Sequence, residues 1–185
     1  MSDMTEMVGD VEFDPALAAA VLEIEEHVAD AGWDAPERLF ALVDTRQLVE
    51  REPALATAMG LDDASAEGSF TPVEQDVEAN RPLEQVLESV MWPADVVGCA
   101  AAVERLVLPP GVDVPEDAVE ARAFAAEHPD RQEVRIVAGV TRAGATYCAL
   151  RLRAHDDPES VVGGADLVPG LLELLRTTLD EEGAP

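Results

Sequence analysis

The clearest structural pattern in the chain lies in residues Glu133 to Asp157, EVRIVAGVTRAGATYCALRLRAHDD. Apolar side chains alternate with polar or small ones from Val134 to Val140 and again from Cys148 to Leu152. This alternation predicts two half-buried strands. A three-residue loop, Arg142 to Gly144 with Gly144 in the left-handed conformation, is a common way to close such a hairpin.

The loop length fixes which side chains lie opposite each other. Counting outward from the loop places Ile136 opposite Leu150 and Val134 opposite Leu152. Even-numbered side chains are then expected to point toward the core and odd-numbered ones toward water. A two-residue loop would set Ile136 against Arg151 and mix the two faces, so we reject it.

The odd-numbered face collects much of the positive charge of the chain. Arg135 is expected opposite Arg151, and Arg153 opposite Glu133. Tyr147 is expected to cover the gap that Gly139 leaves in the sheet. The candidate binding residues for an anion or an acidic partner are therefore Arg135, Tyr147, Arg151, Arg153 and His155.

Two interpretations of this arginine face stay open. In the first, Glu133 and acidic side chains from loops or helices neutralise the arginines in solvated ion pairs, which contribute little energy. In the second, the face binds an anionic ligand or an acidic peptide, because guanidinium groups capture carboxylates and phosphates with two hydrogen bonds.

Helices and strands on either side of the hairpin complete the expected fold. A first helix is expected to begin at Pro15, with Asp14 as its N-cap and an apolar stripe that starts at Leu17. Glu25 is expected to point away from that stripe. The other expected elements are strands 37–43 and 96–110, helices 46–60, 83–91 and 116–128, an irregular extended segment 70–76, and a last helix that begins near 163–166.

These elements predict a single α+β domain that spans residues 1–185. Its antiparallel sheet has a three-stranded meander as its last part and is covered on one face by the N- and C-terminal helices. The first strand, Arg38 to Val43, is expected at an edge. Residues 1–12 and 180–185 are expected to be disordered, and 60–69 to form a mobile loop.

The two cysteines, Cys99 and Cys148, are expected on either side of the central strand of the meander. Their Cα atoms would then lie about 10 Å apart, because neighbouring strands are about 4.8 Å apart. That distance is too long for a disulfide. We therefore expect two core thiols, and a redox pair only if the strand order differs.

The charge of the chain is strongly negative, with 39 acidic and 12 basic residues and a net charge of −27. All the basic residues are Arg, which fits a GC-rich genome, although an acidic surface without Lys also suits a high-salt cytoplasm. Nucleic acids and anionic membranes should be repelled, so neither is expected as a partner. With no signal peptide or apolar span in the sequence, the expected location is the cytoplasm.

Added salt is expected to raise the melting temperature, because it screens the repulsion among the acidic side chains. Thermal unfolding followed from low to molar salt measures this effect. A melting temperature that stays flat or falls over that range would contradict it.

No sequence motif indicates catalysis. The sequence has no glycine-rich phosphate loop, no lysine, no G-x-S-x-G and no C-x-x-C. The three histidines, His27, His128 and His155, are scattered, and His155 to Asp157 forms a polar turn in preference to a metal site. We therefore predict no catalytic residue, no metal site and no cofactor.

Several stretches resemble an uncharacterised actinobacterial protein family. They are RLFALVDT, EQVLESVMWPADVVGCAAAVERLVLPP, RIVAGVTRAGATYCALRLRAHD and VVGGADLVPGLLELLRTTL. The resemblance favours the GC-rich genome and implies no catalytic residues. We expect a non-enzymatic interaction protein, an adaptor or a chaperone-like protein, whose partner is another protein or a second copy of the chain. The alternative is an enzyme or small-anion binder with its site on the arginine face.

Overall fold

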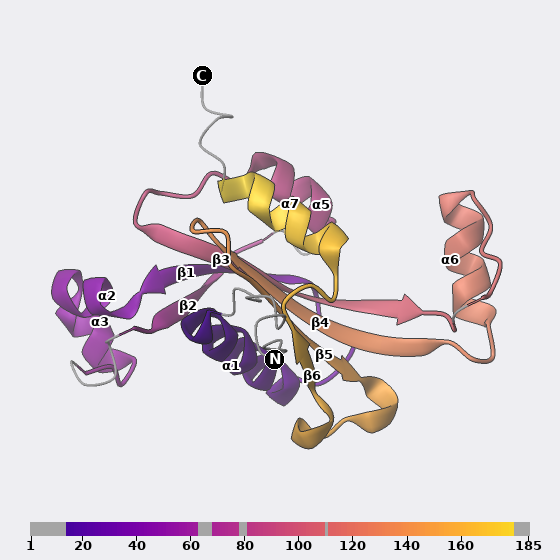
Figure 1. The fold of residues 1–185 in the computed structure, drawn as a ribbon, viewed down its shortest axis with the longest axis horizontal. Helices are drawn as coiled ribbons and strands as arrows, with labels where there is room; N and C mark the ends of the chain where they lie inside the picture. Colours follow the sequence, from indigo (N-terminus) through magenta and orange to yellow (C-terminus); the bar gives the residue numbers. More distant parts are fainter. Residues whose placement is uncertain (1–13, 63–67, 78–80, 110, 180–185) are drawn as a thin grey trace, which may run out of the picture.

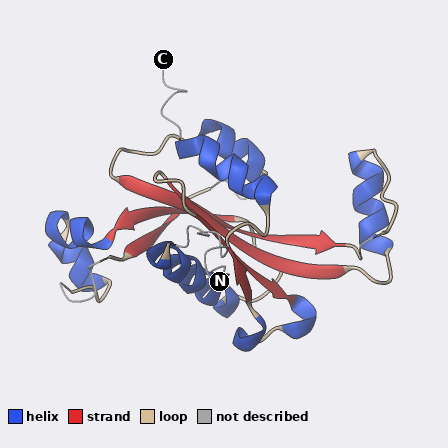
Figure 2. Ribbon diagram, in the orientation of Figure 1, coloured by secondary structure: helices blue, strands red, loops and turns tan. Residues whose placement is uncertain are grey.

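A six-stranded antiparallel sheet, in the order β2-β1-β3-β4-β5-β6, forms the centre of the structure (Figures 1 and 2). The structure is a computed structural model that describes residues 14–62, 68–77, 81–109 and 111–179. The strands are β1 Arg38–Asp44, β2 Phe70–Gln75, β3 Val96–Val107, β4 Gln132–Thr141, β5 Thr146–Leu152 and β6 Val162–Gly164. The helices are α1 Pro15–Asp30, α2 Thr45–Arg51, α3 Pro53–Ala58, α5 Leu83–Ser89, α6 Ala118–Glu127 and α7 Pro169–Leu179, with 3-10 turns η1 Arg153–His155 and η2 Pro158–Ser160. The predicted α+β class and the β3–β4–β5 meander are confirmed.

The β4–β5 hairpin has the predicted register. Ile136 pairs with Leu150, and Val134 pairs with Leu152. Gly144 has a φ of 95°, and its backbone N–H donates to the carbonyl of Thr141. A side chain at this φ would be strained, so glycine allows the three-residue loop.

Helices cover both faces of the sheet, which contradicts the predicted single covered face (Figure 1). On the even-numbered face of β4, α5 and α7 pack on a core that includes Leu87, Ile136 and Leu175. On the odd-numbered face, α1 packs on a second core that includes Leu17 and Val137. The odd-numbered side chains in the middle of this face, Arg135, Val137, Ala149 and Arg151, are therefore buried beneath a helix and do not point toward water.

Gly139 lets α1 approach the sheet closely. A Cβ atom at this position would lie 2.8 Å from a methyl group of Val21 and 3.1 Å from a methyl group of Leu17. Tyr147 pairs with Gly139 as predicted. However, side chains of α1 occupy the space above the glycine, and the Tyr147 hydroxyl lies against Gly163. The prediction that Tyr147 covers Gly139 is therefore wrong.

Strand β1 lies inside the sheet, between β2 and β3, so its predicted edge position is wrong. The segment predicted to be irregular, 70–76, contains the edge strand β2. Pro72 has no backbone N–H to donate, and an edge strand tolerates that loss because only one of its sides is paired. The segment was predicted to be irregular because of this proline, but an edge strand can contain it.

The C-terminal helix starts later than predicted. Residues 162–164 form the short edge strand β6, and α7 begins only at Pro169. Among the segments predicted to be disordered or mobile, 1–12, 63–67 and 180–185 lie outside the described residues.

Strands β3 and β4 extend past their neighbours as a two-stranded arm. The pairing of β1 with β3 ends at Ala102, and that of β5 with β4 ends at Val134, whereas β3 and β4 pair as far as Val107 and Gln132. Figure 1 shows this extension at the right, with α6 standing away from the sheet. We call the described residues 106–109 and 111–133 the arm.

Candidate functional site

Two of the candidate arginines, Arg135 and Arg151, lie with Glu104 on one row across the sheet, which we call the arginine row. Glu104 on β3 pairs with Arg135 on β4, which pairs with Arg151 on β5. Arg135 and Arg151 were predicted opposite each other, and this prediction is confirmed. Both are buried, because the C-terminal half of α1 and the loop that follows it lie above the row.

Arg151 forms a buried ion pair with Glu25 of α1. The Glu25 side chain is 2 % exposed, and a second carboxylate, that of Asp156, accepts from Arg151 Nη1 at 3.1 Å. Burial opposes the positive charge, but the hydrogen bonds and charges of Asp156 and Glu25 outweigh it and raise the pKa of Arg151. The Trp33 indole and then Arg151 hold the pKa of Asp156 below its usual range.

Arg135 is almost completely buried, at 1 % exposed. Its guanidinium lies 4.3 Å from the ring centroid of Trp33, and its Nη2 donates to the carbonyl of Gly32 at 2.9 Å. Its Nε and Nη1 have no hydrogen-bond partner among the residues that the structure describes. On the same row, the Glu104 carboxylate accepts from the backbone N–H groups of Asp34 and Ala35, both at 2.9 Å.

Arg153 begins the turn η1, two residues after Arg151. Its Nη1 contacts Asp34 at 3.0 Å and Glu133 at 2.7 Å, so the predicted opposition of Glu133 and Arg153 takes the form of an ion pair. The hydrogen bonds that the Arg153 guanidinium donates to Asp34 and then to Glu133 raise the pKa of Arg153. About two fifths of its side chain is open to solvent.

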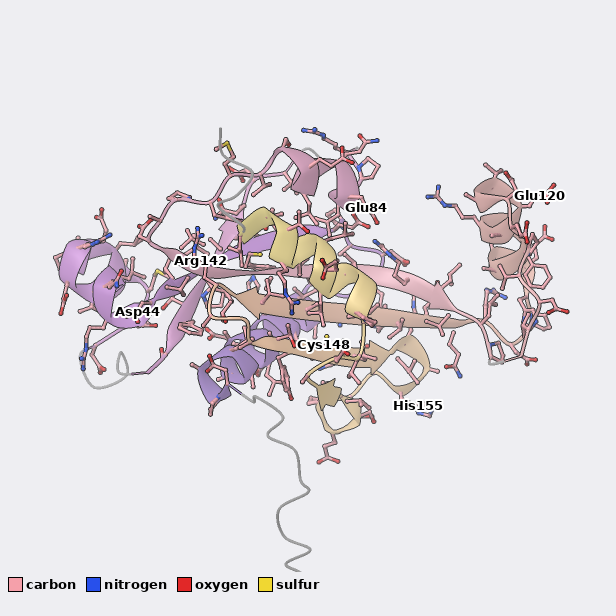
Figure 3. The ribbon with its side chains drawn as sticks, turned by 45° about the horizontal axis from the view of Figure 1, so that its top comes forward. Asp44, Glu84, Glu120, Arg142, Cys148 and His155 are labelled. Carbon is pink, nitrogen blue, oxygen red and sulfur yellow. The ribbon has the colours of Figure 1, made fainter. Side chains whose placement is uncertain are left out.

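The fourth arginine of the hairpin, Arg142, serves a separate purpose at the turn. It donates to the carbonyl of Leu179 at the end of α7 and to that of Val96 at the start of β3, at 2.9 and 2.7 Å. A cation beside the last carbonyls of a helix is favourable. Figure 3 shows Arg142 at this end of the sheet, far from His155.

The structure brings three of the five candidate residues together: Arg135, Arg151 and Arg153. His155 is exposed on η1, and Tyr147 is half-buried further along β5. The residues that sequence reasoning missed are Glu25, Trp33, Asp34, Glu104 and Asp156. Glu25 was expected to point away from the apolar stripe of α1, but it lies four residues after Val21 and therefore on the same side of the helix. That spacing was the available signal.

The ion pairs and hydrogen bonds of this site attach α1 and the loop after it to strands β3, β4 and β5. The carboxylates of Glu25, Asp156, Asp34 and Glu133 neutralise two of the arginines, while Glu104 and Arg135 hold the loop after α1. Within the described ranges, no three His, Cys, Asp or Glu side chains are grouped so that they could hold a metal ion. No helix in the described part of the chain is long and apolar enough to span a membrane.

The two cysteines lie on either side of β4, as predicted. Cys99 pairs with Val140 and Cys148 with Ala138, so a full strand separates them, and both are free and buried. Burial raises the pKa of Cys99 to about 11, and burial also raises the pKa of Cys148. Neither thiol is therefore ionised at neutral pH.

In the folded protein, we expect both thiols to resist a disulfide reagent, because the thiolate is the reactive form and the sheet shields both sulfur atoms. The reagent releases a coloured thiolate when it reacts with a protein thiol. The absorbance of that thiolate, recorded with and without guanidinium, measures how many protein thiols react and how fast. Two thiols per chain should react in the denaturant, with only slow reaction in native buffer. A rapid reaction of either thiol in native buffer would contradict the burial.

Comparisons with known proteins identify the family of the chain. No curated protein and no solved structure matches it. The model of one family, described as PPA1309-like protein, matches residues 17–180, from the first turns of α1 to the end of α7. That description names no activity. Since the match covers nearly the whole chain, the protein belongs to the PPA1309-like protein family.

Proposed function

We propose that the protein is a non-enzymatic cytoplasmic interaction protein, an adaptor or small chaperone-like protein, that meets its partner through the arm. The observation that carries this proposal is the exposure of apolar side chains on the arm. Val119 on α6 is 75 % exposed, and α6 contributes no buried residue. A two-stranded ribbon is only marginally stable in water, and exposed apolar patches are typical of interaction surfaces.

The rest of the sheet offers less for a partner. Both faces carry helices, and the arginine row lies beneath α1. Of the two edges, β2 contains Pro72, which cannot donate to an added strand, and β6 has only three residues. The arm combines reach with apolar surface, so it supports an interaction function better than the faces or the edges.

Affinity capture from the native host, with three tagged proteins, tests this proposal. The wild type is compared with an arm variant, Val114→Asp with Val119→Asp, and with a control variant on α1, Leu22→Asp, which changes an exposed apolar side chain elsewhere. We expect one partner to be retained by the wild type and the control and lost by the arm variant.

Light scattering of the purified protein shows whether that partner is a second copy of the chain. If the arm variant retains every partner, the arm is the wrong surface. If the wild type retains nothing beyond the tag alone and is a monomer, the interaction function itself is wrong.

A second candidate function is the binding of a small anion, by a binding protein or an enzyme, at the arginine face formed by Arg135, Tyr147, Arg151, Arg153 and His155. It is favoured by Arg135, whose buried Nε and Nη1 have no partner within the described residues. Buried donors usually have an acceptor, and guanidinium groups suit carboxylates and phosphates. A thermal-shift screen with phosphate, carboxylates and nucleotides tests it on the wild type and on Arg135→Gln. A shift of equal size in both proteins would exclude this site.

A further inference from the structure

The arm carries a charge as well as apolar surface. Six carboxylates and two arginines lie between Val107 and Gln132. The acidic side chains of this stretch include Glu116 and Glu120, which are exposed beside Val119 at the start of α6. Figure 3 shows Glu120 on α6, away from the sheet. The arm therefore presents aliphatic groups and negative charges together.

Four exposed large apolar side chains belong to the arm: Leu106, Val107, Val114 and Val119. They come from the outer end of β3, from the segment before α6, and from α6 itself. The last pairs of the β3–β4 ribbon, Leu106 with Glu133 and Val107 with Gln132, have no further strand beside them in the described structure. A partner could therefore reach these side chains without displacing any described strand.

The negative charge of the chain determines which kind of partner can bind to this surface. A second copy would bring its own acidic arm or its acidic body against the arm, with a net charge of −27 on each chain. A nucleic acid would be repelled for the same reason. A basic protein segment would be attracted by the negative charge of the arm, and its aliphatic side chains can cover the exposed valines.

Resting on the proposed interaction function, we infer that the arm docks a basic amphipathic segment of another protein. Lys or Arg side chains of that segment face Glu116 and Glu120, while its aliphatic side chains pack on Val114 and Val119. The apolar contacts supply affinity, and the charges speed association and reject acidic partners.

Labelled synthetic peptides of about 18 residues, roughly five helical turns, provide the probe for this inference. One is an amphipathic helix of Leu and Lys, the second has the same composition in shuffled order, and the third is amphipathic with Glu in place of Lys. Fluorescence anisotropy with the full chain at low and moderate salt gives each dissociation constant. We expect the Leu/Lys helix to bind, more weakly at the higher salt, and the other two to bind at least about tenfold more weakly.

Matched variants locate the binding. Val119→Gln should weaken the Leu/Lys peptide about fivefold to tenfold, while Leu22→Gln on α1 should leave its affinity unchanged. Glu116→Gln with Glu120→Gln should weaken it at low salt more than Glu23→Gln with Glu26→Gln, which removes the same charge from α1. Circular dichroism of each variant checks that the fold is retained.

Several results would overturn the inference. Equal losses from the α1 and arm variants would mean diffuse attraction to an acidic surface, and equal binding of the Leu/Glu peptide would mean that charge does not select the partner. A dimer that Val119→Gln dissociates would assign the arm to a second copy. If the peptides fail while affinity capture still shows a partner lost from the arm variant, only the partner chemistry is wrong and the interaction function stands.

Discussion

Replacing Arg151 with Met is expected to lower the free energy of unfolding by about 3–5 kcal/mol. The side chain of Arg151 is 7 % exposed, and its partner Glu25 lies deeper. Without the guanidinium, the Glu25 carboxylate would remain buried without a counter-charge, and that state is costly. Denaturant unfolding followed by circular dichroism measures the loss.

Arg153→Met is the matched control, because it makes the same chemical change two residues further along the chain, at solvent-exposed ion pairs. Surface pairs contribute little, so this variant should lose much less stability than Arg151→Met. Similar losses in the two variants would show that Arg151 is as exposed as Arg153 and that α1 does not cover it.

Replacing Leu17 with Ala is expected to cost about 2–5 kcal/mol, the range for a large side chain removed from a packed core. Leu17 has no exposed surface and packs on the odd-numbered face of the sheet, next to Gly139. The stability is lost because less apolar surface is buried and because a cavity remains where the leucine side chain was. Chemical unfolding curves with a shared slope give the difference between the variant and the wild type.

Leu22→Ala provides the comparison on the same helix, because Leu22 is 42 % exposed. An exposed substitution of this kind usually changes stability by no more than about 0.5 kcal/mol. If Leu17→Ala proved as mild as Leu22→Ala, the odd-numbered face of the sheet would be open to water, as the sequence alone had suggested.

The β4–β5 hairpin could be predicted from the sequence because its register is a local property. Alternating side chains and the left-handed residue Gly144 settle the pairing within about twenty residues. The Arg135–Arg151 and Glu133–Arg153 oppositions follow from that pairing, and the separation of Cys99 from Cys148 follows from the meander. The Arg135–Arg151 opposition and the separation of the cysteines are present in the structure. Glu133 and Arg153 meet as an ion pair and not as a strand pair, because β5 ends at Leu152 and Arg153 lies in η1.

The cover over the arginine face could not be predicted in the same way, because it comes from α1, more than a hundred residues earlier in the chain. Signals of a second buried face were nevertheless present. Val137 and Ala149 are apolar residues on the odd-numbered face, and the run RLFALV in β1 has no polar alternation. Continuous apolar strands are typical of sheets covered on both faces.

The sequence predicted the strand and the helix of the arm but not their position beyond the sheet. A strand over 96–110 and a helix over 116–128 were both expected, close to the observed β3 and α6. Their projection beyond the sheet depends on where β1 and β5 stop pairing, at Ala102 of β3 and Val134 of β4. Exposure of Val119 is therefore a property of the whole fold rather than of the local sequence.

A double-mutant cycle on Glu25 and Arg151 is the most direct test of the buried contact between α1 and the arginine row. Glu25→Leu, Arg151→Met and the double variant are compared with the wild type by chemical unfolding at low and high salt. We predict a coupling energy of at least about 2 kcal/mol that changes little with salt, and a double variant more stable than Arg151→Met alone. A coupling below about 0.5 kcal/mol that disappears in high salt would contradict it, because that is the behaviour of a solvated surface pair.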